Sequence, residues 1–195
     1  MRILLIGATG TIGSAIASAL SQHDVIGASR SRAAETVDIT DAASIHALLK
    51  RVRTVDAIIC AAGGGAWKPL AELTDADFES SVHDKLMGQV NVARYGFASV
   101  ADGGSITLTS GVLATQPMVN SAAISLVNSG VEGFGRAAAL EAPRGIRVNV
   151  VSPPWVSETL AVMGQDPSWG LTAEVVARAY VASVEGAETG KIISP

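Results

Sequence analysis

The sequence predicts an α/β fold: a doubly wound parallel sheet of about seven strands with helices on both faces, in a single domain over residues 1–195. Two observations lead to this prediction. Short apolar runs alternate with helical patterns along the whole chain, which is typical of right-handed βαβ units. No repeat, linker or low-complexity tract divides the sequence, and its 48% of apolar residues suffice for one large core.

The expected elements follow one another along the chain. Strand-like runs lie at 2–6, 24–29, 36–39 (a weak one), 55–61, 104–109, 146–151 and 190–193. Helical patterns lie at 11–22, 41–53, 75–99, 119–142, 157–163 (a short one) and 172–184. Asp41 and Thr74-Asp75 are suitable N-caps for the helices that follow them. In such sheets ligands bind beyond the carboxyl ends of the strands, so residues there are the first candidates for function.

Glycines near the amino end mark a turn between the first strand and the first helix. An apolar run stops at Gly7, and a helical pattern begins near Thr11. Gly7 allows the tight turn, Gly10 lets the backbone approach a pyrophosphate, and Gly13 lets the helix pack closely on the strand. The helix N-terminus presents free N–H groups and its positive dipole end to an anion. This Rossmann-type pattern predicts a nucleotide phosphate site, rather than a turn alone, at Gly7, Thr9, Gly10, Thr11, Ile12 and Gly13.

Composition excludes several other classes of protein. The formal net charge is −4 and no cluster of basic residues is present, which disfavours binding to nucleic acid. The single cysteine excludes an intrachain disulfide and a Cys-based metal site, and the three histidines show no ligand spacing, so we expect no metal. No apolar run reaches membrane-spanning length, and the first strand begins at once, without a signal peptide. We therefore expect a cytoplasmic protein without a membrane partner.

The segment after the second expected strand, Ser29-Arg30-Ser31-Arg32, bears on which dinucleotide binds. A site for NAD usually has an acidic residue here, which accepts hydrogen bonds from the 2′-hydroxyl of the ribose. This turn has no acidic neighbour, and a guanidinium pairs well with a 2′-phosphate. The segment favours NADP(H) over NAD, unless both arginines are solvated loop residues. The expected contacts come from Ser29, Arg30 and Ser31.

Two further segments follow strands on the same side of the sheet. Asp38 comes after the weak third strand, where it either accepts a hydrogen bond from the adenine amino group or serves the loop as a cap. The fourth strand runs into Ala61-Ala62-Gly63. Such small residues allow a ribose to lie on the backbone, although the glycine could equally serve only the turn. We include all four residues among the expected cofactor contacts.

Beyond these segments, the chain resembles the short-chain dehydrogenase/reductase family over essentially its whole length. The motifs that carry the resemblance, besides the glycine turn, are Cys60-Ala61-Ala62-Gly63, Thr107-Leu108-Thr109-Ser110, Val131-Glu132-Gly133-Phe134, Arg147-Val148-Asn149-Val150-Val151-Ser152-Pro153 and Thr189-Gly190. The resemblance implies a seven-stranded Rossmann-type sheet, a bound nicotinamide dinucleotide, and a homodimer or homotetramer built on the two long helices. It also implies cofactor contacts from Pro153 and Val156. The chain further resembles a short subgroup that lacks the usual active-site residues.

The departures from the family concern its active site. The catalytic serine of the family corresponds to Ser110 and is present. The tyrosine and the lysine of the family correspond to Ile124 and Asn128, so both are lost. The asparagine of the family corresponds to Lys85, on the preceding helix. Lysine and asparagine have exchanged places between the two helices, and an aliphatic side chain replaces the phenol.

These departures lead to a hypothesis about catalysis. A desolvated lysine can act as an acid or a base, so Lys85 could supply the positive charge or the proton that the missing pair supplied. Ser110 would then hydrogen-bond a substrate oxygen, and Asn128 would orient the ribose or a water. The alternative for Lys85 is a surface lysine on a helix. Three tryptophans in the loops over the strand ends either wall an apolar substrate pocket or seal the core: Trp67, Trp155 and Trp169.

Three functions remain open from the sequence. The first is an NADP(H)-dependent oxidoreductase that acts on a small molecule with an altered proton-transfer system. The second is a catalytically inactive protein that binds or senses the dinucleotide. The third is a non-redox enzyme on the same fold, for example an isomerase. Ser110 and the intact phosphate turn favour the first two over the third.

Overall fold

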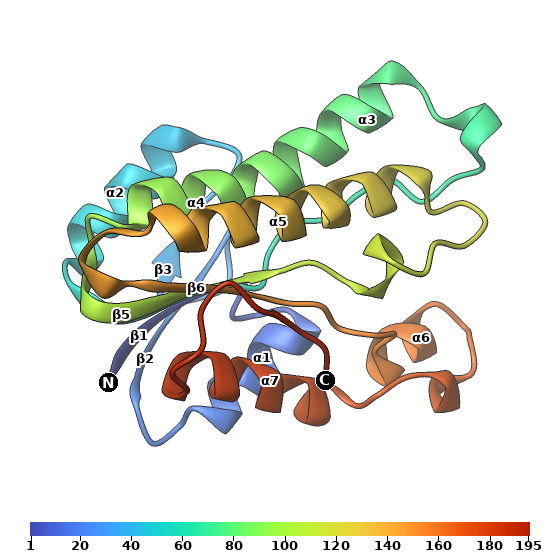
Figure 1. The fold of residues 1–195 in the computed structure, drawn as a ribbon. Helices are drawn as coiled ribbons and strands as arrows, with labels where there is room; N and C mark the ends of the chain where they lie inside the picture. Colours follow the sequence, from blue (N-terminus) through green and yellow to red (C-terminus); the bar gives the residue numbers. More distant parts are fainter.

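A parallel sheet forms the middle layer of the protein, in a computed structural model that describes all 195 residues (Figure 1). Its seven strands have the order β3-β2-β1-β4-β5-β6-β7. They are β1 (Arg2–Ile6), β2 (Asp24–Ser29), β3 (Glu35–Thr36), β4 (Val55–Cys60), β5 (Val100–Thr109), β6 (Arg147–Val151) and β7 (Ile192–Ile193). The predicted doubly wound α/β fold is confirmed. The strand order reverses between β1 and β4, where folds of this kind bind ligands.

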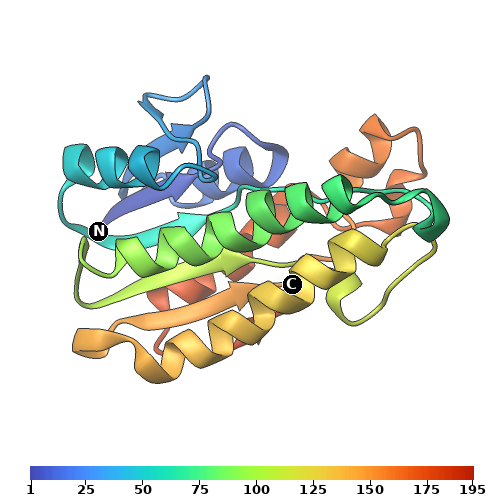
Figure 2. The same cartoon turned by 90° about the horizontal axis from the view of Figure 1, so that it is seen from above.

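Helices cover both faces of the sheet (Figures 1 and 2). One face carries α2 (Ala42–Val52), α4 (Gly88–Gly96) and α5 (Ala122–Glu141), and the other carries α1 (Thr11–Ala19) and α7 (Ala173–Glu185). Seen from above, α4 and α5 run side by side along the sheet (Figure 2). The short α6 (Ser157–Val162) lies beyond the carboxyl ends of the strands. No helix combines the length and the apolar character that crossing a membrane requires.

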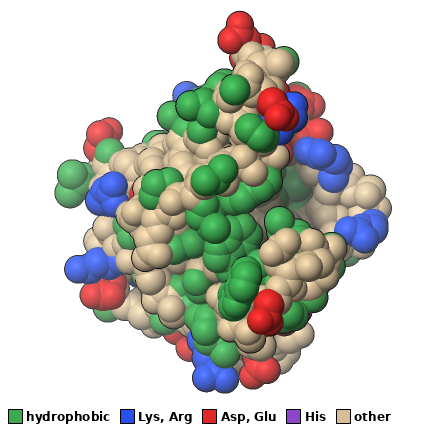
Figure 3. Space-filling view, turned by 90° about the vertical axis from the view of Figure 1, so that its right-hand side faces the viewer, with side chains coloured by type: hydrophobic (Ala, Val, Ile, Leu, Met, Phe, Trp, Pro, Cys, Tyr) green, Lys and Arg blue, Asp and Glu red, His purple; other side chains and the backbone are tan.

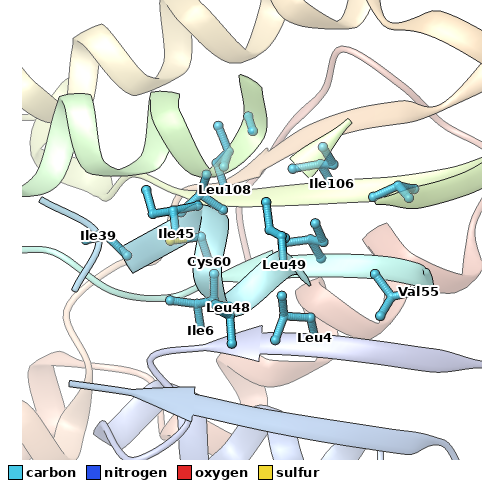
Figure 4. Close-up of a cluster of buried hydrophobic side chains, with 14 of the residues drawn as sticks. Leu4, Ile6, Ile39, Ile45, Leu48, Leu49, Val55, Cys60, Ile106 and Leu108 are labelled. Atoms are coloured by element: carbon cyan, nitrogen blue, oxygen red, sulfur yellow. The ribbon is translucent and has the colours of Figure 1, made fainter. Parts of the chain in front are cut away.

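The core consists of two apolar layers, one on each face of the sheet. Leu4 and Ile6 of β1 belong to the larger cluster of 21 buried residues, under α2, α4 and α5 (Figure 4). Ile3 and Leu5 of the same strand belong to a cluster of 14 buried residues under α1 and α7. Strands buried on both faces read as continuous apolar runs, which explains the sequence pattern of β1. This rigid core fixes the strand ends that carry the site.

Some element boundaries differ from the prediction, for local reasons. β3 pairs with β2 at only two positions, and just after it the Asp38 carboxylate accepts hydrogen bonds from the N–H and the hydroxyl of Thr40. α5 begins at Ala122 rather than 119, because residues 118–121 form a turn in which Asn120 has a φ of +73°. β5 begins at Val100 rather than 104, where its register with β4 shifts.

The predicted helix 75–99 is continuous but contains a change of geometry. It consists of α3 (Asp75–Ser81), a π-helical stretch η2 (Val82–Met87) and α4. A capping box starts α3, in which Thr74 and Asp77 exchange hydrogen bonds. π-Helical turns are frequent at functional sites, and this one lies where the helix passes the ends of β4 and β5.

Candidate functional site

Two cavities at the carboxyl ends of the strands share one wall. The first has a volume of about 300 Å³ and lies over the ends of β1, β2 and β4. The second has a volume of about 310 Å³ and lies over the ends of β4, β5 and β6. Both are lined by Ala61, Ala62 and Gly63. We refer to these two adjoining cavities together as the crevice, and their shared wall lies beside the point where the strand order reverses.

The glycine turn closes the floor of the first cavity. Gly7 has a φ of +91°, and a Cβ there would lie 2.6 Å from the carbonyl oxygen of Ala61. A Cβ on Gly13 would lie 2.0 Å from the carbonyl oxygen of Gly7, so only glycine lets α1 approach β1 so closely. Gly10 is the N-cap of α1 and no side chain caps this helix. The amide of Gly10 donates to Gly7, which leaves the amides after it as the ones that an anion would meet.

The predicted cofactor residues divide into three groups. Those that line the first cavity are Gly7, Thr9, Gly10, Ser29, Arg30, Ala61, Ala62 and Gly63. Those that line the second cavity, besides the shared wall, are Ile12, Pro153 and Val156. Four line neither of them: Thr11, Gly13, Ser31 and Asp38. Of these, Gly13 packs against the turn itself, whereas Thr11 lines a separate hollow between α1 and α7.

Arg30 lies at the rim of the first cavity between two carboxylates. Its Nη2 is 3.5 Å from Asp38 Oδ1 and 3.7 Å from Asp84 Oδ1. Two-thirds of the Arg30 side chain is exposed, so these long ion pairs hold it weakly. Hydrogen bonds from Thr40 lower the pKa of Asp38, so this carboxylate stays ionised and serves the local turn. Arg32 lines the same cavity.

Lys85 is buried, which rules out the alternative of a surface lysine. It lies in η2, is 8% exposed, and its Nζ donates a hydrogen bond to the carbonyl oxygen of Ser110 at 3.0 Å. A Cβ on Gly63 would lie 2.8 Å from the Cα of Lys85, so this glycine allows the helix to approach β4. Burial lowers the pKa of the Lys85 ammonium to about 8.

The other two expected catalytic residues line the same cavity as Lys85. The hydroxyl of Ser110 donates to Glu132 Oε1 at 2.9 Å, so its proton points away from any substrate carbonyl. The amide nitrogen of Asn128 makes one long contact, 3.5 Å, with the carbonyl oxygen of Gly111, and its Oδ1 is buried without a partner. Buried acceptors are normally satisfied, so the hydrogen-bonding capacity of this oxygen is unused in the resting structure.

Sequence reasoning missed two polar residues beside the site. Gln89 lies one helical turn after Lys85, and its side-chain amide accepts from the N–H of Thr109 and donates to the carbonyl of Thr109, both at 2.7 Å. It therefore fixes the end of β5, next to Ser110. The second is Glu132, which is 5% exposed on α5. The spacing of four from Lys85 could have indicated Gln89. Glu132 stands in one of the motifs that carry the family resemblance, but nothing in that motif marks the side chain as buried.

Tryptophans wall a third cavity, next to the second. Trp67 and Trp155 pack edge to face with ring centroids 5.7 Å apart, and Trp155 lines both cavities. The third cavity has a volume of about 230 Å³ and no charged residue in its wall: Trp67, Met118, Trp155, Leu160, Met163, Gln165 and Trp169. Apolar side chains gather in the middle of one face of the molecule, around a hollow (Figure 3). No group of three or more His, Cys, Asp or Glu residues is placed to hold a metal ion.

Comparisons with known proteins agree with this geometry. A family model described as enoyl-(acyl carrier protein) reductase matches residues 7–192. The crystal structure of the protein lin1944 from Listeria innocua is 40% identical, covers 100% of this chain and 98% of its own, and has a TM-score of 0.95. A small-chain dehydrogenase in complex with NADPH is 25% identical, with a TM-score of 0.87 and coverage of 100% and 96%.

Curated relatives are more distant in sequence. Hydroxynaphthalene reductase arp2 of Aspergillus fumigatus is 28% identical over 152 residues, which are 73% of this chain and 56% of that protein. A hydroxynaphthalene reductase-like protein of Metarhizium brunneum is 31% identical over 137 residues, 67% of this chain and 51% of that protein. The chain thus matches only about half the length of these relatives.

Proposed function

The chain belongs to the short-chain dehydrogenase/reductase family, and from that premise we propose that it is an NADP(H)-dependent oxidoreductase acting on a small molecule. One observation carries the proposal: a single crevice joins the glycine turn, at one end, to buried Lys85, at the other. A crevice at the switch point of the sheet has the position and the chemistry that a dinucleotide requires.

The residues present fit such a cofactor. The adenosine half would lie in the first cavity, with its pyrophosphate on the amides after Gly10. The nicotinamide half would lie in the second cavity, where the Asn128 side chain would turn its unpartnered Oδ1 towards a ribose hydroxyl. Arg30 is held weakly enough to turn to a 2′-phosphate, which favours NADP(H). When bound, this cofactor supplies the hydride transfer.

Lys85 carries the proposed electrostatic role. Its ammonium group is buried, so its charge acts through a medium of low polarity and is strongly felt nearby. A substrate oxygen beside Ser110 in the second cavity would develop negative charge, which a fixed positive charge stabilises. The tryptophan-walled third cavity, adjacent through Trp155, would hold an apolar part of the substrate.

A second candidate is a dinucleotide-binding protein without turnover. The observation that favours it is Ile124, an aliphatic residue in the wall of the second cavity, where the family has its tyrosine. Removing a positioned proton donor typically costs about 10² to 10⁴ in rate. This candidate predicts the same cofactor binding as the oxidoreductase, and differs from it only in turnover.

Titration and turnover separate these functions. NADPH and NADH are titrated into the wild type and Arg30→Ala by fluorescence, with NADPH affinity expected to fall about 10- to 100-fold in the variant and NADH affinity to stay unchanged. Turnover of NADPH is then followed with a panel of ketones, aldehydes and imines that includes 1-tetralone. Consumption supports the oxidoreductase, and binding without consumption supports the second candidate. Tighter binding of NADH would contradict the role given to Arg30.

We also propose that the chain forms a homodimer or homotetramer through α4 and α5. The observations that support it are the large apolar side chains exposed on α5, Leu126 at 50% and Leu140 at 89%. Sedimentation velocity of the wild type and of Leu140→Asp tests the proposal. A monomeric wild type at micromolar concentration would contradict it.

A further inference from the structure

A buried carboxylate, that of Glu132, accepts a hydrogen bond from the hydroxyl of Ser110. Glu132 lies one helical turn after Asn128 on α5 and is 5% exposed. Its Oε1 accepts hydrogen bonds from Ser110 Oγ at 2.9 Å and from Ser152 Oγ at 3.1 Å. Removing a carboxylate from water is costly unless it is paired and hydrogen-bonded. The two hydroxyls that donate to one oxygen of Glu132 offset part of this cost.

Two hydroxyls and one long ion pair surround the Glu132 carboxylate. From the ends of β5 and β6 it faces hydroxyls, those of Ser110 and Ser152. The cation nearest to it is Arg136 on its own helix, half-exposed and 3.9 Å from Oε2. Lys85 binds the carbonyl oxygen of Ser110, not its hydroxyl. Glu132 therefore has one direct polar connection to the second cavity, through the hydroxyl of Ser110.

This connection fixes what Ser110 can do. A serine hydroxyl has one proton to donate and two lone pairs that accept. Because the proton of Ser110 is given to Glu132, its oxygen can accept a hydrogen bond from a substrate hydroxyl but cannot donate one to a carbonyl. In the resting structure, Ser110 is thus arranged to accept a proton from a substrate hydroxyl. The family's phenol, by contrast, is replaced by Ile124, which exchanges no proton.

We propose that Ser110 and Glu132 form a proton relay that takes the place of the missing tyrosine, a proposal that rests on the proposed oxidoreductase function. When a substrate alcohol is oxidised, its O–H bond breaks and the proton passes to Ser110 Oγ, while the proton of Ser110 passes to Glu132 Oε1. Ser110 ends neutral, and Glu132 ends as the carboxylic acid. The two electrons and the hydrogen that leave carbon go to the oxidised nicotinamide. Reduction of a ketone runs the same proton path in reverse, from protonated Glu132.

Lys85 and Glu132 then have separate tasks. Lys85 stabilises negative charge on the substrate oxygen, and Glu132 stores the proton that this oxygen releases. Other buried titratable side chains near the strand ends are unsuitable stores, since burial raises the pKa of the Cys60 thiol to about 12 and that of the Tyr180 phenol further still. Glu132 acts through Ser110, so it is a positioning and relay residue, while Ser110 contacts the substrate.

Kinetics of matched variants test the relay. Oxidation of 1-tetralol by NADP⁺ and reduction of 1-tetralone by NADPH are measured in the wild type, Glu132→Gln, Ser110→Ala and the double variant. Each single variant is expected to lower kcat/KM by about 10² to 10⁴, and the double variant to lower it little further, because the two residues act as a unit. Glu141→Gln, the same change at an exposed site on α5, should leave both rates unchanged.

One readout separates a relay from a merely structural role. Infrared difference spectra recorded on acidification should show a carboxylic-acid band that Glu132→Gln lacks and that Ser110→Ala shifts, and this readout needs no turnover. Thermal melting and NADPH titration establish that the variants fold and bind.

The outcomes are distinct. If the wild type turns over 1-tetralol and Glu132→Gln matches it within about threefold, or if Glu132→Gln keeps the carboxylic-acid band, the relay is wrong while the oxidoreductase function stands. Independent, multiplying losses in the double variant would also overturn the relay. If the wild type binds NADPH but turns over no member of the carbonyl panel, the oxidoreductase function fails and the relay fails with it.

Discussion

Replacing Lys85 with methionine should change how the stability of the protein depends on pH. Methionine keeps most of the length of the side chain and removes its charge. In the folded protein burial lowers the pKa of Lys85 from its ordinary 10.5 to about 8, whereas the unfolded chain keeps the ordinary value. Between these two pH values the unfolded state binds more protons, so the stability of the wild type rises with pH.

The magnitude follows from the two pKa values. Since one pH unit corresponds to 1.36 kcal/mol, the difference between 10.5 and about 8 makes the buried charge cost about 3 kcal/mol below pH 8. Lys85→Met removes this cost but leaves the carbonyl of Ser110 without its donor, which costs about 1–3 kcal/mol. The two effects nearly cancel at pH 7. The informative quantity is the change between pH 7 and pH 9.5, where the wild type should gain about 2 kcal/mol relative to the variant.

Urea unfolding at both pH values measures this change. The wild type, Lys85→Met and Lys50→Met are compared, because Lys50 is an exposed lysine on α2 and serves as the matched control. The free energy of unfolding of Lys50→Met should follow that of the wild type, and only Lys85→Met should lack the gain at high pH. Parallel pH dependence in all three proteins would refute the burial of the charged ammonium, and with it the electrostatic role given to Lys85.

Three further predictions test the turn, the strand end and the core. Gly13→Ala places a Cβ 2.0 Å from a backbone oxygen. It should therefore lower the free energy of unfolding in urea by about 1–3 kcal/mol and weaken NADPH binding at least tenfold. The control Gly133→Ala has open space around the added Cβ and should change neither quantity. Gln89→Ala leaves the N–H and the carbonyl of Thr109 unsatisfied and should lower the free energy of unfolding by about 2–4 kcal/mol. A loss below about 0.5 kcal/mol would refute the stabilising role given to these two hydrogen bonds. Since burial raises the pKa of Cys60 to about 12, its thiol should react with Ellman's reagent at pH 8 only after unfolding, and rapid labelling of the folded protein would contradict this.

The fold was predictable because local and global signals agree in this chain. The alternation of apolar runs and helical patterns predicted the right types of element. Gly7 and Gly13 indicated the first turn, because a larger residue at either position would clash with the backbone. The boundary of β3 was not predictable from periodicity, since Val37 and Ile39 are apolar and buried yet follow the strand. Hydrogen bonds from Thr40 to Asp38 form a turn just after the strand, and local contacts of this kind leave no period in the sequence.

The candidate site was predictable in its residues but less so in their contacts. Lys85 could be found from its position relative to the motifs shared with the family. Its burial could not, because the side chain lies in a π-helical stretch that the sequence does not predict. Glu132 could not be found, because a glutamate on a helix is normally solvated and only the packing of α5 on β5 and β6 brings it to Ser110 and Ser152. Those contacts also direct the proton of the Ser110 hydroxyl to Glu132, which the sequence does not indicate.

The proposed dinucleotide site lies in the crevice between the glycine turn and Lys85. A crystal structure of the protein grown with saturating NADPH measures this directly. We expect the pyrophosphate against the amides that follow Gly10, the 2′-phosphate within reach of Arg30, and the nicotinamide ring in the cavity lined by Lys85 and Asn128. Electron density for the cofactor elsewhere on the surface, or none in this crevice, would contradict the account.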